Sequence, residues 1–186
     1  MIKGMPGVYE KGAYDSADVA YSRWYAMLRR CYNPKTMKAQ PTYDGCYVCD
    51  EWLNFQNYAA WFHNTCPGNP VDYDVDKDLL DPYNKCYSPE TCVFLPHALN
   101  ILCKNDSGHN KFGCVGVIWD SERNKYRVRF EFKGARVNGG RHETKEAALA
   151  EYLKLKKEKI REIAEEYKDV LEPRAYRALL CYEPKA

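Results

Sequence analysis

The chain has 186 residues, of which 45% are hydrophobic and 14% aromatic, and this composition excludes general disorder while allowing one substantial domain or two small ones. The formal net charge is +2, but one segment from Arg123 to Arg141 carries seven basic residues against the single acid Glu131. No apolar run is long enough to cross a membrane, and residues 1–6 contain no apolar signal region. We therefore expect a reducing, cytoplasmic setting.

The first part of the chain predicts helices. Residues 1–16 contain glycine, tyrosine and aspartate and are typical of an arm or loop. The segment Ser16-Ala17-Asp18 predicts a capped helix that runs to Arg30, because apolar residues follow at helical spacing. Asp50 is expected to cap a second helix, residues 51–64, which is aromatic over much of its circumference and should pack on the first.

Residues 72–100 concentrate several signals in a short stretch. Acidic residues alternate with apolar and basic ones from Asp72 to Asp78, and a turn-rich segment follows at residues 81–92. The segment Val93-Phe94-Leu95 predicts a short buried strand. Pro96 is well suited to begin a helix, since its missing N–H would have no helical partner there.

These residues resemble the HNH endonuclease family, in its phage and intron-encoded variety, through the turn Tyr-Ser-Pro-Glu-Thr-Cys at 87–92 and the strand and helix that follow. The order Trp-x-x-Met-Leu-x-Arg-Cys-Tyr at 24–32, followed by Val-Cys-Asp-Glu-Trp at 48–52, resembles the leader of such proteins. The resemblance covers residues 20–104 and implies a ββα-metal region. It implies Asp76 and Asn100 as ligands of one divalent cation, with Mg²⁺ expected because both supply hard oxygen atoms.

The catalytic positions of the motif depart from the family pattern. Lys77 stands where the family places its general-base histidine, and Thr91 where it places the residue that orients that histidine. An ammonium is a poor base unless burial lowers its pKa by several units. His97, one helical turn before Asn100, is the alternative base. A plain alternative is that the aspartates form a solvated acidic edge.

Nine cysteines raise the question of a second metal site. Cys46 and Cys49 form a Cys-x-x-Cys, which could be half of a zinc site or a redox pair. The zinc hypothesis is the weaker one, because the sequence has no second Cys-x-x-Cys and no spaced histidine pair. Buried thiols that pack as small apolar groups are favoured.

The composition changes after Leu102, and residues 104–112 predict a linker rich in polar and helix-breaking residues. A second unit follows, with a strand at 115–119, a hairpin turn at 120–124 and an alternating strand at 125–133. Gly139-Gly140 is expected to close a third strand. Thr144 then caps a helix whose predicted apolar side carries Ala147, Ala148, Leu149, Tyr152 and Leu155, continued by a charged, solvated run; Pro173 begins a last short helix.

Three antiparallel strands followed by one helix resemble the AP2 DNA-binding domain, through the order Gly-Val, Lys-Tyr-Arg, Arg-Val and Thr-x-Glu-Ala-Ala. That resemblance implies a sheet laid in the major groove with the helix on its opposite face. The residues expected to bind DNA are Trp119, Arg127, Arg129, Arg136 and Arg141. The alternation alone supports an outward arginine face, because the other side of the 125–133 strand is apolar.

We therefore expect an α+β protein with an HNH-like domain at 1–103, the linker at 104–112 and an AP2-like domain with C-terminal helices at 113–186. The expected function is binding of double-stranded DNA with divalent-metal-dependent cleavage, as in homing endonucleases. The alternatives are a DNA-binding regulator that does not cut, or a phage host-takeover or counter-defence protein that binds a host protein.

Overall fold

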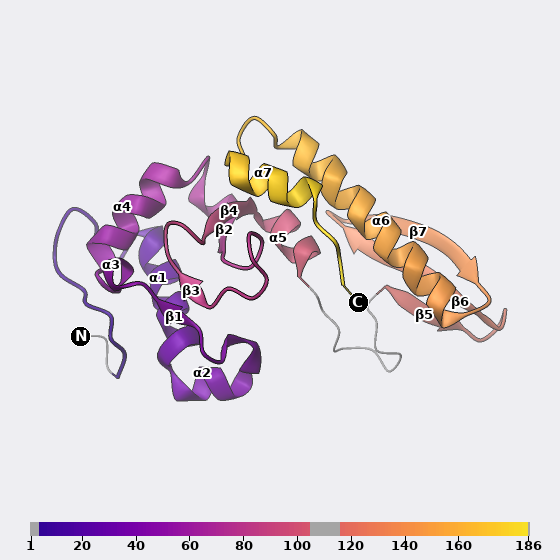
Figure 1. Ribbon diagram of the computed structural model, residues 1–186, viewed down its shortest axis with the longest axis horizontal. Helices are drawn as coiled ribbons and strands as arrows, with labels where there is room; N and C mark the ends of the chain where they lie inside the picture. Colours follow the sequence, from indigo (N-terminus) through magenta and orange to yellow (C-terminus); the bar gives the residue numbers. More distant parts are fainter. Residues whose placement is uncertain (1–3, 105–115, 186) are drawn as a thin grey trace. The chain divides into compact units, whose positions relative to one another are not determined.

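The computed structural model describes residues 4–104 and 116–185, and its class is mixed α+β, as the sequence predicts (Figure 1). The chain divides into two compact units, Met1–Leu95 and Pro96–Ala186. This division differs from the predicted boundary after residue 103, because the helix that begins at His97 groups with the second unit. The predicted linker at 104–112 lies outside the described residues except for Lys104.

Short helices and two small sheets make up the first unit. Its helices are α1 (Val19–Tyr32), α2 (Pro34–Ala39), α3 (Asp50–Leu53) and α4 (Phe55–Thr65), with 3-10 turns at Pro41–Tyr43 and Pro70–Asp72. Its strands are β1 (Tyr47–Val48), β2 (Tyr73–Asp76), β3 (Cys86–Tyr87) and β4 (Val93–Pro96). Strand β1 pairs in parallel with β3, and β2 pairs with β4.

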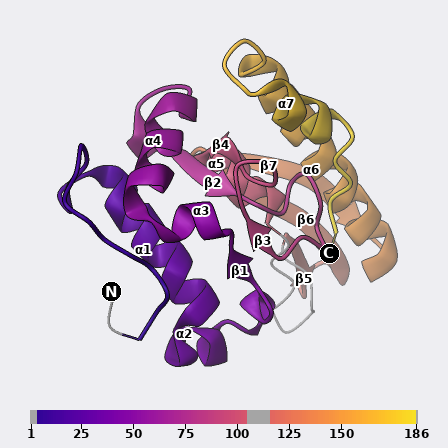
Figure 2. The ribbon, with the colours of Figure 1, turned by 60° about the vertical axis from the view of Figure 1, so that its left-hand side comes forward.

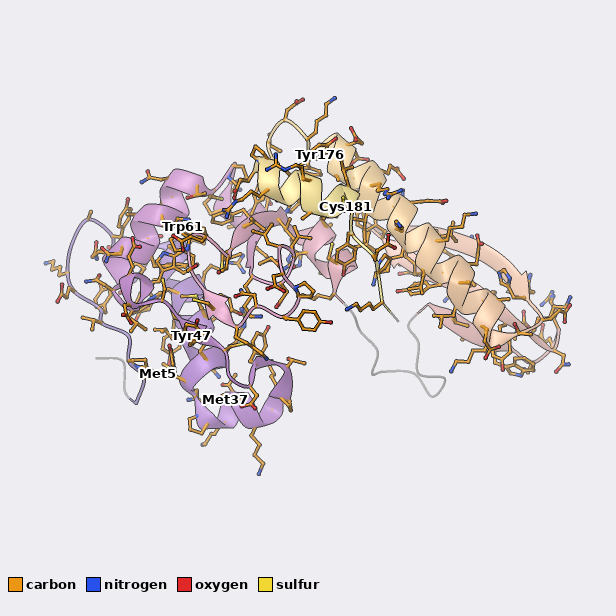
Figure 3. All side chains as sticks on the ribbon, in the orientation of Figure 1. Met5, Met37, Tyr47, Trp61, Tyr176 and Cys181 are labelled. Carbon is orange, nitrogen blue, oxygen red and sulfur yellow. The ribbon has the colours of Figure 1, made fainter. Side chains whose placement is uncertain are left out.

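Aromatic side chains form the core of this unit. The N-cap of α1 is Asp18, whose carboxylate accepts a hydrogen bond from the backbone of Ala20 over 2.8 Å. Helix α1 packs on α4 (Figure 2), and the indole of Trp24 donates to the backbone oxygen of Trp52 over 2.6 Å. Trp61, labelled in Figure 3, lies 4.3 Å from the ring of Trp52 and stacks on Phe94 at 5.1 Å. The predicted aromatic helix is thus a core element, as expected.

The second predicted helix, residues 51–64, is in fact two helices broken at Asn54. The N-terminal arm pairs with the chain at this break, where the backbone of Val8 donates to Leu53 and accepts from Phe55, over 2.8 and 3.0 Å. The side chain of Asn54 caps α4 by accepting from the backbone of Gln56 over 2.9 Å. The first of the two helices includes Asp50 and is preceded by Cys49, so the expected Asp50 cap is wrong.

The described residues of the second unit form one three-stranded sheet and three helices (Figure 1). The elements are α5 (His97–Cys103), β5 (Val117–Asp120), β6 (Lys125–Phe132), β7 (Ala135–His142), α6 (Lys145–Glu166) and α7 (Pro173–Leu180). The sheet is antiparallel in the order β5-β6-β7, and α6 packs on one of its faces. Thr144 caps α6 as predicted, accepting from the backbone of Ala147 over 3.1 Å.

The third strand continues through the glycine pair that was expected to end it. The pairing of β6 with β7 shifts between Arg127 and Arg129, and Gly140 adopts a φ of +79°, which favours glycine. A Cβ atom at Gly139 would lie 2.7 Å from both Val128 and Leu155. The glycines therefore form an irregularity that lets the strand continue beneath α6.

Helix α6 buries a different set of residues from the predicted one. Ala148 and Tyr152 are buried, but Ala147 is exposed. The charged run is not wholly solvated, because Lys156 is only 4% exposed. Helix α7 follows as predicted, and the hydroxyl of Tyr176, labelled in Figure 3, donates to Glu165 near the end of α6 over 2.6 Å.

Among the helices that the structure describes, none combines the length and the apolar character that crossing a membrane requires.

Candidate nucleic-acid interface and metal site

The two faces of the β5-β6-β7 sheet differ in chemistry. Residues that alternate along β6 point to opposite faces, and cross-strand partners share a face. Val128 pairs with Val117, and both are fully buried on the side that α6 covers. Arg127 pairs with Arg141, so these two arginines share the face away from the helix. The predicted arginine face is therefore present in the fold.

The same register adds further charged residues to this outward face. Arg129 pairs with Asn138 and Glu131 with Arg136 along β7, while Asp120 pairs with Lys125 at the start of the sheet. The sequence pattern alone did not place Asp120 or Lys125 on this face. Asp120 was expected inside the turn at 120–124, whereas the structure closes the hairpin with residues 121–124. A four-residue turn is the signal that could have placed Asp120 and Lys125 opposite each other.

The arginines of the outward face fall into two groups. Arg141 Nε lies 2.9 Å from Asp120 Oδ2, and Arg136 Nη2 lies 3.9 Å from Glu131 Oε1. Arg127 and Arg129, on the middle strand, form no ion pair with any described residue. The Nε atom of Arg127 is buried without a hydrogen-bond partner in the part of the chain described. The middle strand thus presents two guanidinium groups whose charge no described carboxylate neutralises.

A hollow of about 270 Å³ lies at the hairpin end of the sheet. Its walls are mostly polar and come from Trp119, Asp120, Ser121, Glu122, Arg123 and Arg127. Arg123 Nη1 lies 3.5 Å from Asp120 Oδ2, and the hydrogen bond from Arg141 holds the pKa of Asp120 below its usual range. The carboxylate of Asp120 therefore contacts the guanidinium groups of Arg123 and Arg141, and Arg127 borders the same hollow.

The expectation that Trp119 shares the arginine face is wrong. Trp119 pairs with Tyr126, and their rings meet edge to face at 4.8 Å. Because Val117 is two residues earlier on the same strand and is buried under α6, Trp119 belongs to the helix side of the sheet. Trp119 therefore lines the edge of the hollow, while its ring packs on the face of the sheet that α6 covers.

In the first unit, Asp76 is the last residue of β2. Its Oδ1 atom accepts hydrogen bonds from the backbone of Asp78 and Leu79, over 2.9 and 2.7 Å. Burial raises the pKa of Asp76, although these two hydrogen bonds oppose the shift. Its Oδ2 atom accepts no hydrogen bond from any described residue. The carboxylate is thus fixed through one of its two oxygens.

Lys77 cannot act as the general base that its position suggested. It is only 5% exposed, and its ammonium donates to Asp78 and, over 3.1 Å, to the backbone oxygen of Asn84. Burial alone would lower the pKa of Lys77, but the hydrogen bond to Asp78 and the surrounding negative charge raise it above the ordinary value. The ammonium also lies 5.7 Å from the centre of the Tyr87 ring. Lys77 is a protonated residue that stabilises the loop from 77 to 87.

Thr91 has a local role of the same kind. Its hydroxyl donates to the backbone oxygen of Cys86 over 2.8 Å and accepts from the backbone of Ser88 over 3.1 Å. These bonds hold the turn between β3 and β4, and none of them reaches a histidine.

His97 and Asn100 lie on α5 in the second unit, whereas Asp76 lies in the first. His97 is exposed and Asn100 is 6% exposed, so the two residues differ in environment although one helical turn separates them. Among the described histidines, cysteines, aspartates and glutamates, no group of three could hold a metal ion. Asparagine is not one of these residue types, so the pair of Asp76 and Asn100 stays a prediction.

The cysteines of the first unit are free thiols, and several are buried. Burial raises the pKa of Cys31 and of Cys92 to about 12 and also raises that of Cys49. Cys46 is buried beside β1. Buried thiols of this kind pack as small apolar groups. The choice between this interpretation and half of a zinc site stays a prediction.

The fold and these sites define an α+β protein with an arginine-bearing sheet face in one unit and a fixed carboxylate in the other. Comparisons of the chain with protein-family models, with curated proteins and with solved structures find no match.

Proposed function

We propose that this protein binds double-stranded DNA through the outward face of its β5-β6-β7 sheet, in the manner of an AP2-like domain. The observation that carries the proposal is that Arg127 and Arg129, side by side on the middle strand, have no ion-pair partner among the described residues. Guanidinium groups suit phosphate and guanine geometry, and a sheet can enter the major groove.

The proposed interface is tested by fluorescence anisotropy with a labelled duplex at several salt concentrations. Wild-type affinity should fall steeply as salt rises, because phosphate contacts release counterions. The variant Arg127→Ala/Arg129→Ala should bind more weakly and reduce the slope of log K against log salt by about 2.

The matched control removes two positive charges elsewhere in the same unit. Lys154 on α6 and Arg177 on α7 are exposed and have no assigned role at the sheet. Lys154→Ala/Arg177→Ala should bind DNA nearly as the wild type does. Equal losses of DNA affinity in both double variants would contradict the proposed interface. So would a DNA affinity that does not depend on salt concentration.

We propose, as a second function, Mg²⁺-dependent cleavage of the bound strand by the HNH-like residues 20–104. Its support is the carboxylate of Asp76, which is fixed through Oδ1. The cation would offset charge that develops on the phosphate. Asn100 is the second oxygen ligand by resemblance, and His97 is the proposed proton acceptor because Lys77 is held as an ammonium.

Plasmid nicking separates this second function from its alternative. Asp76→Asn keeps an oxygen for the backbone donors of residues 78 and 79 but removes the charge that Mg²⁺ requires. Nicking by the wild type with Mg²⁺ should disappear in Asp76→Asn and persist in Asp72→Ala, which alters an exposed neighbouring acid.

A wild type that binds DNA but never nicks it would establish the alternative, a DNA-binding regulator or counter-defence protein. The structural hydrogen bonds of Lys77 and Thr91 favour that alternative, because both positions stabilise loops where the family has catalytic groups.

A further inference from the structure

The ion pair between Asp120 and Arg141 crosses the full width of the sheet. Asp120 is on β5, Arg141 is on β7, and β6 lies between these two strands. Adjacent strands are about 4.8 Å apart, so a contact between the outer strands must pass over the middle one. Asp120 is paired with Lys125 and Arg141 with Arg127, so the ion pair crosses β6 between these two residues.

Arg127 lies beside this bridge. It borders the same hollow as Asp120 and Arg123, and its Nε atom is buried without a partner in the described chain. Arg123 contacts the same oxygen of Asp120 that Arg141 contacts, at 3.5 and 2.9 Å. The carboxylate of Asp120 thus holds Arg123 and Arg141 close to Arg127, which is one of the two arginines proposed to bind DNA.

A bridge of this kind can be exchanged for an external anion. The side chain of Arg141 is 37% exposed and that of Asp120 is 11% exposed, so an external anion reaches the pair from its guanidinium side, where salt also weakens it. A phosphate oxygen offers the arginines the same charge and geometry as the carboxylate does. Duplex DNA supplies many such oxygens together and gains entropy from released counterions. Exchange of Asp120 for phosphate is therefore favourable for a polyanion but not for scattered small anions.

We propose that Asp120 is an internal counter-anion of the DNA-binding face, which holds Arg141 and Arg123 in the free protein until a backbone phosphate displaces it. This inference rests on the proposed DNA-binding function and assigns a regulatory residue to that site. If Asp120 holds Arg141 and Arg123 in this way, the free protein has fewer arginines available for anions. Small anions should then bind this face weakly.

The test compares two isosteric variants that each remove one negative charge from the same face. Asp120→Asn removes the bridging carboxylate, and Glu131→Gln removes the acid that lies 3.9 Å from Arg136 and is itself mostly exposed. Asp120→Asn should bind a duplex roughly fivefold more tightly and steepen the salt slope by about 1. Glu131→Gln should also gain affinity, but less than Asp120→Asn does, because the contact of Glu131 with Arg136 is longer, at 3.9 Å, and more exposed. Thermal unfolding first establishes that both variants are folded.

A second readout needs no DNA. The Nε–H signal of Arg141 in a ¹⁵N NMR spectrum of the free protein should move in Asp120→Asn and stay in place in Glu131→Gln. An unmoved signal in Asp120→Asn would show that the bridge does not form in solution and would overturn the inference. The inference also fails if the wild type binds DNA but Asp120→Asn binds no more tightly than Glu131→Gln. A signal that moves in a protein that binds no DNA would instead overturn the proposed function.

Discussion

The ammonium of Lys156, on α6, donates a hydrogen bond over 3.0 Å to the backbone oxygen of Lys104, the residue that follows α5. The hydroxyl of Tyr182, near the end of the chain, donates to the backbone oxygen of Cys103. Carbonyl groups at the end of a helix lack helical partners and carry partial negative charge, so a cation and a hydroxyl are suitable donors there. These two contacts bind α5 to the rest of the second unit.

We expect Lys156→Met to destabilise the second unit by about 1–3 kcal/mol, because it removes the partly buried hydrogen bond to the backbone oxygen of Lys104. Chemical denaturation followed by circular dichroism measures the change. Lys154→Met, an exposed position on the same helix, is the control and should leave stability nearly unchanged. Similar losses in both variants would mean that the buried ammonium has no special role.

Trp119→Ala should lower stability by about 2 kcal/mol, less than for a fully buried tryptophan, because the ring packs on Tyr126 and is half-buried. Its folded fraction should still bind DNA with nearly wild-type affinity. Arg129→Ala should show the opposite pattern, with stability retained and DNA affinity reduced. A Trp119 variant that is fully stable and loses affinity would return this residue to the interface.

Gly139→Ala should destabilise the sheet by about 1–3 kcal/mol, because the added methyl group would meet Val128 and Leu155 at 2.7 Å. Asn138→Ala, at an exposed neighbouring position, provides the comparison and should have a small effect. Thermal unfolding curves of the two variants measure the difference. An unchanged melting temperature in Gly139→Ala would contradict the close approach of α6 to β7.

The first unit should lose stability in alkali. Burial raises the pKa of Cys31 and Cys92 to about 12, whereas an unfolded thiol titrates near 9. Between these values the folded chain keeps protons that the unfolded chain releases, so the free energy of unfolding falls as pH rises. Urea midpoints from tryptophan fluorescence, in the presence of a reducing agent, should therefore decrease from about pH 9 upwards.

Cysteine variants test whether these two thiols cause the pH dependence, through the slope of the urea midpoint against pH. Cys31→Ala/Cys92→Ala should give midpoints that depend less on pH than those of the wild type, whatever the variant's stability at neutral pH. Cys181→Ala, which alters an exposed thiol, should give a curve parallel to that of the wild type. Identical slopes in all three proteins would assign the alkaline loss to other groups, such as the buried tyrosines.

Local patterns predicted much of this fold. The alternation of Arg127 and Val128 along β6 placed one arginine outside and one valine inside, because strand periodicity and burial agree there. The cap at Thr144 and a cap within Ser16-Ala17-Asp18 were predicted for a similar reason, and the structure identifies Asp18 as the capping residue of that segment. Local signals were not uniformly reliable, since the expected cap at Asp50 is wrong.

Features that depend on distant partners were not predictable from the sequence. The strand that contains Trp119 is too short to fix a register by itself, and only the pairing of Trp119 with Tyr126 decides its side of the sheet. The break at Asn54 is where the arm that contains Val8, far earlier in the chain, pairs with the chain. Lys77 resembles a possible base in the sequence because its partner Asn84 and the ring of Tyr87 become neighbours only in the folded loop.

The contacts of Lys156 and Tyr182 with the end of α5 determine where the protein can be divided for separate study. A fragment that begins at residue 113, at the predicted domain edge, would discard the acceptor carbonyls of Cys103 and Lys104 and leave a buried ammonium without that acceptor. A fragment that begins at residue 96 retains both acceptors. Crystallisation trials and binding assays on the isolated sheet should therefore start from the longer piece.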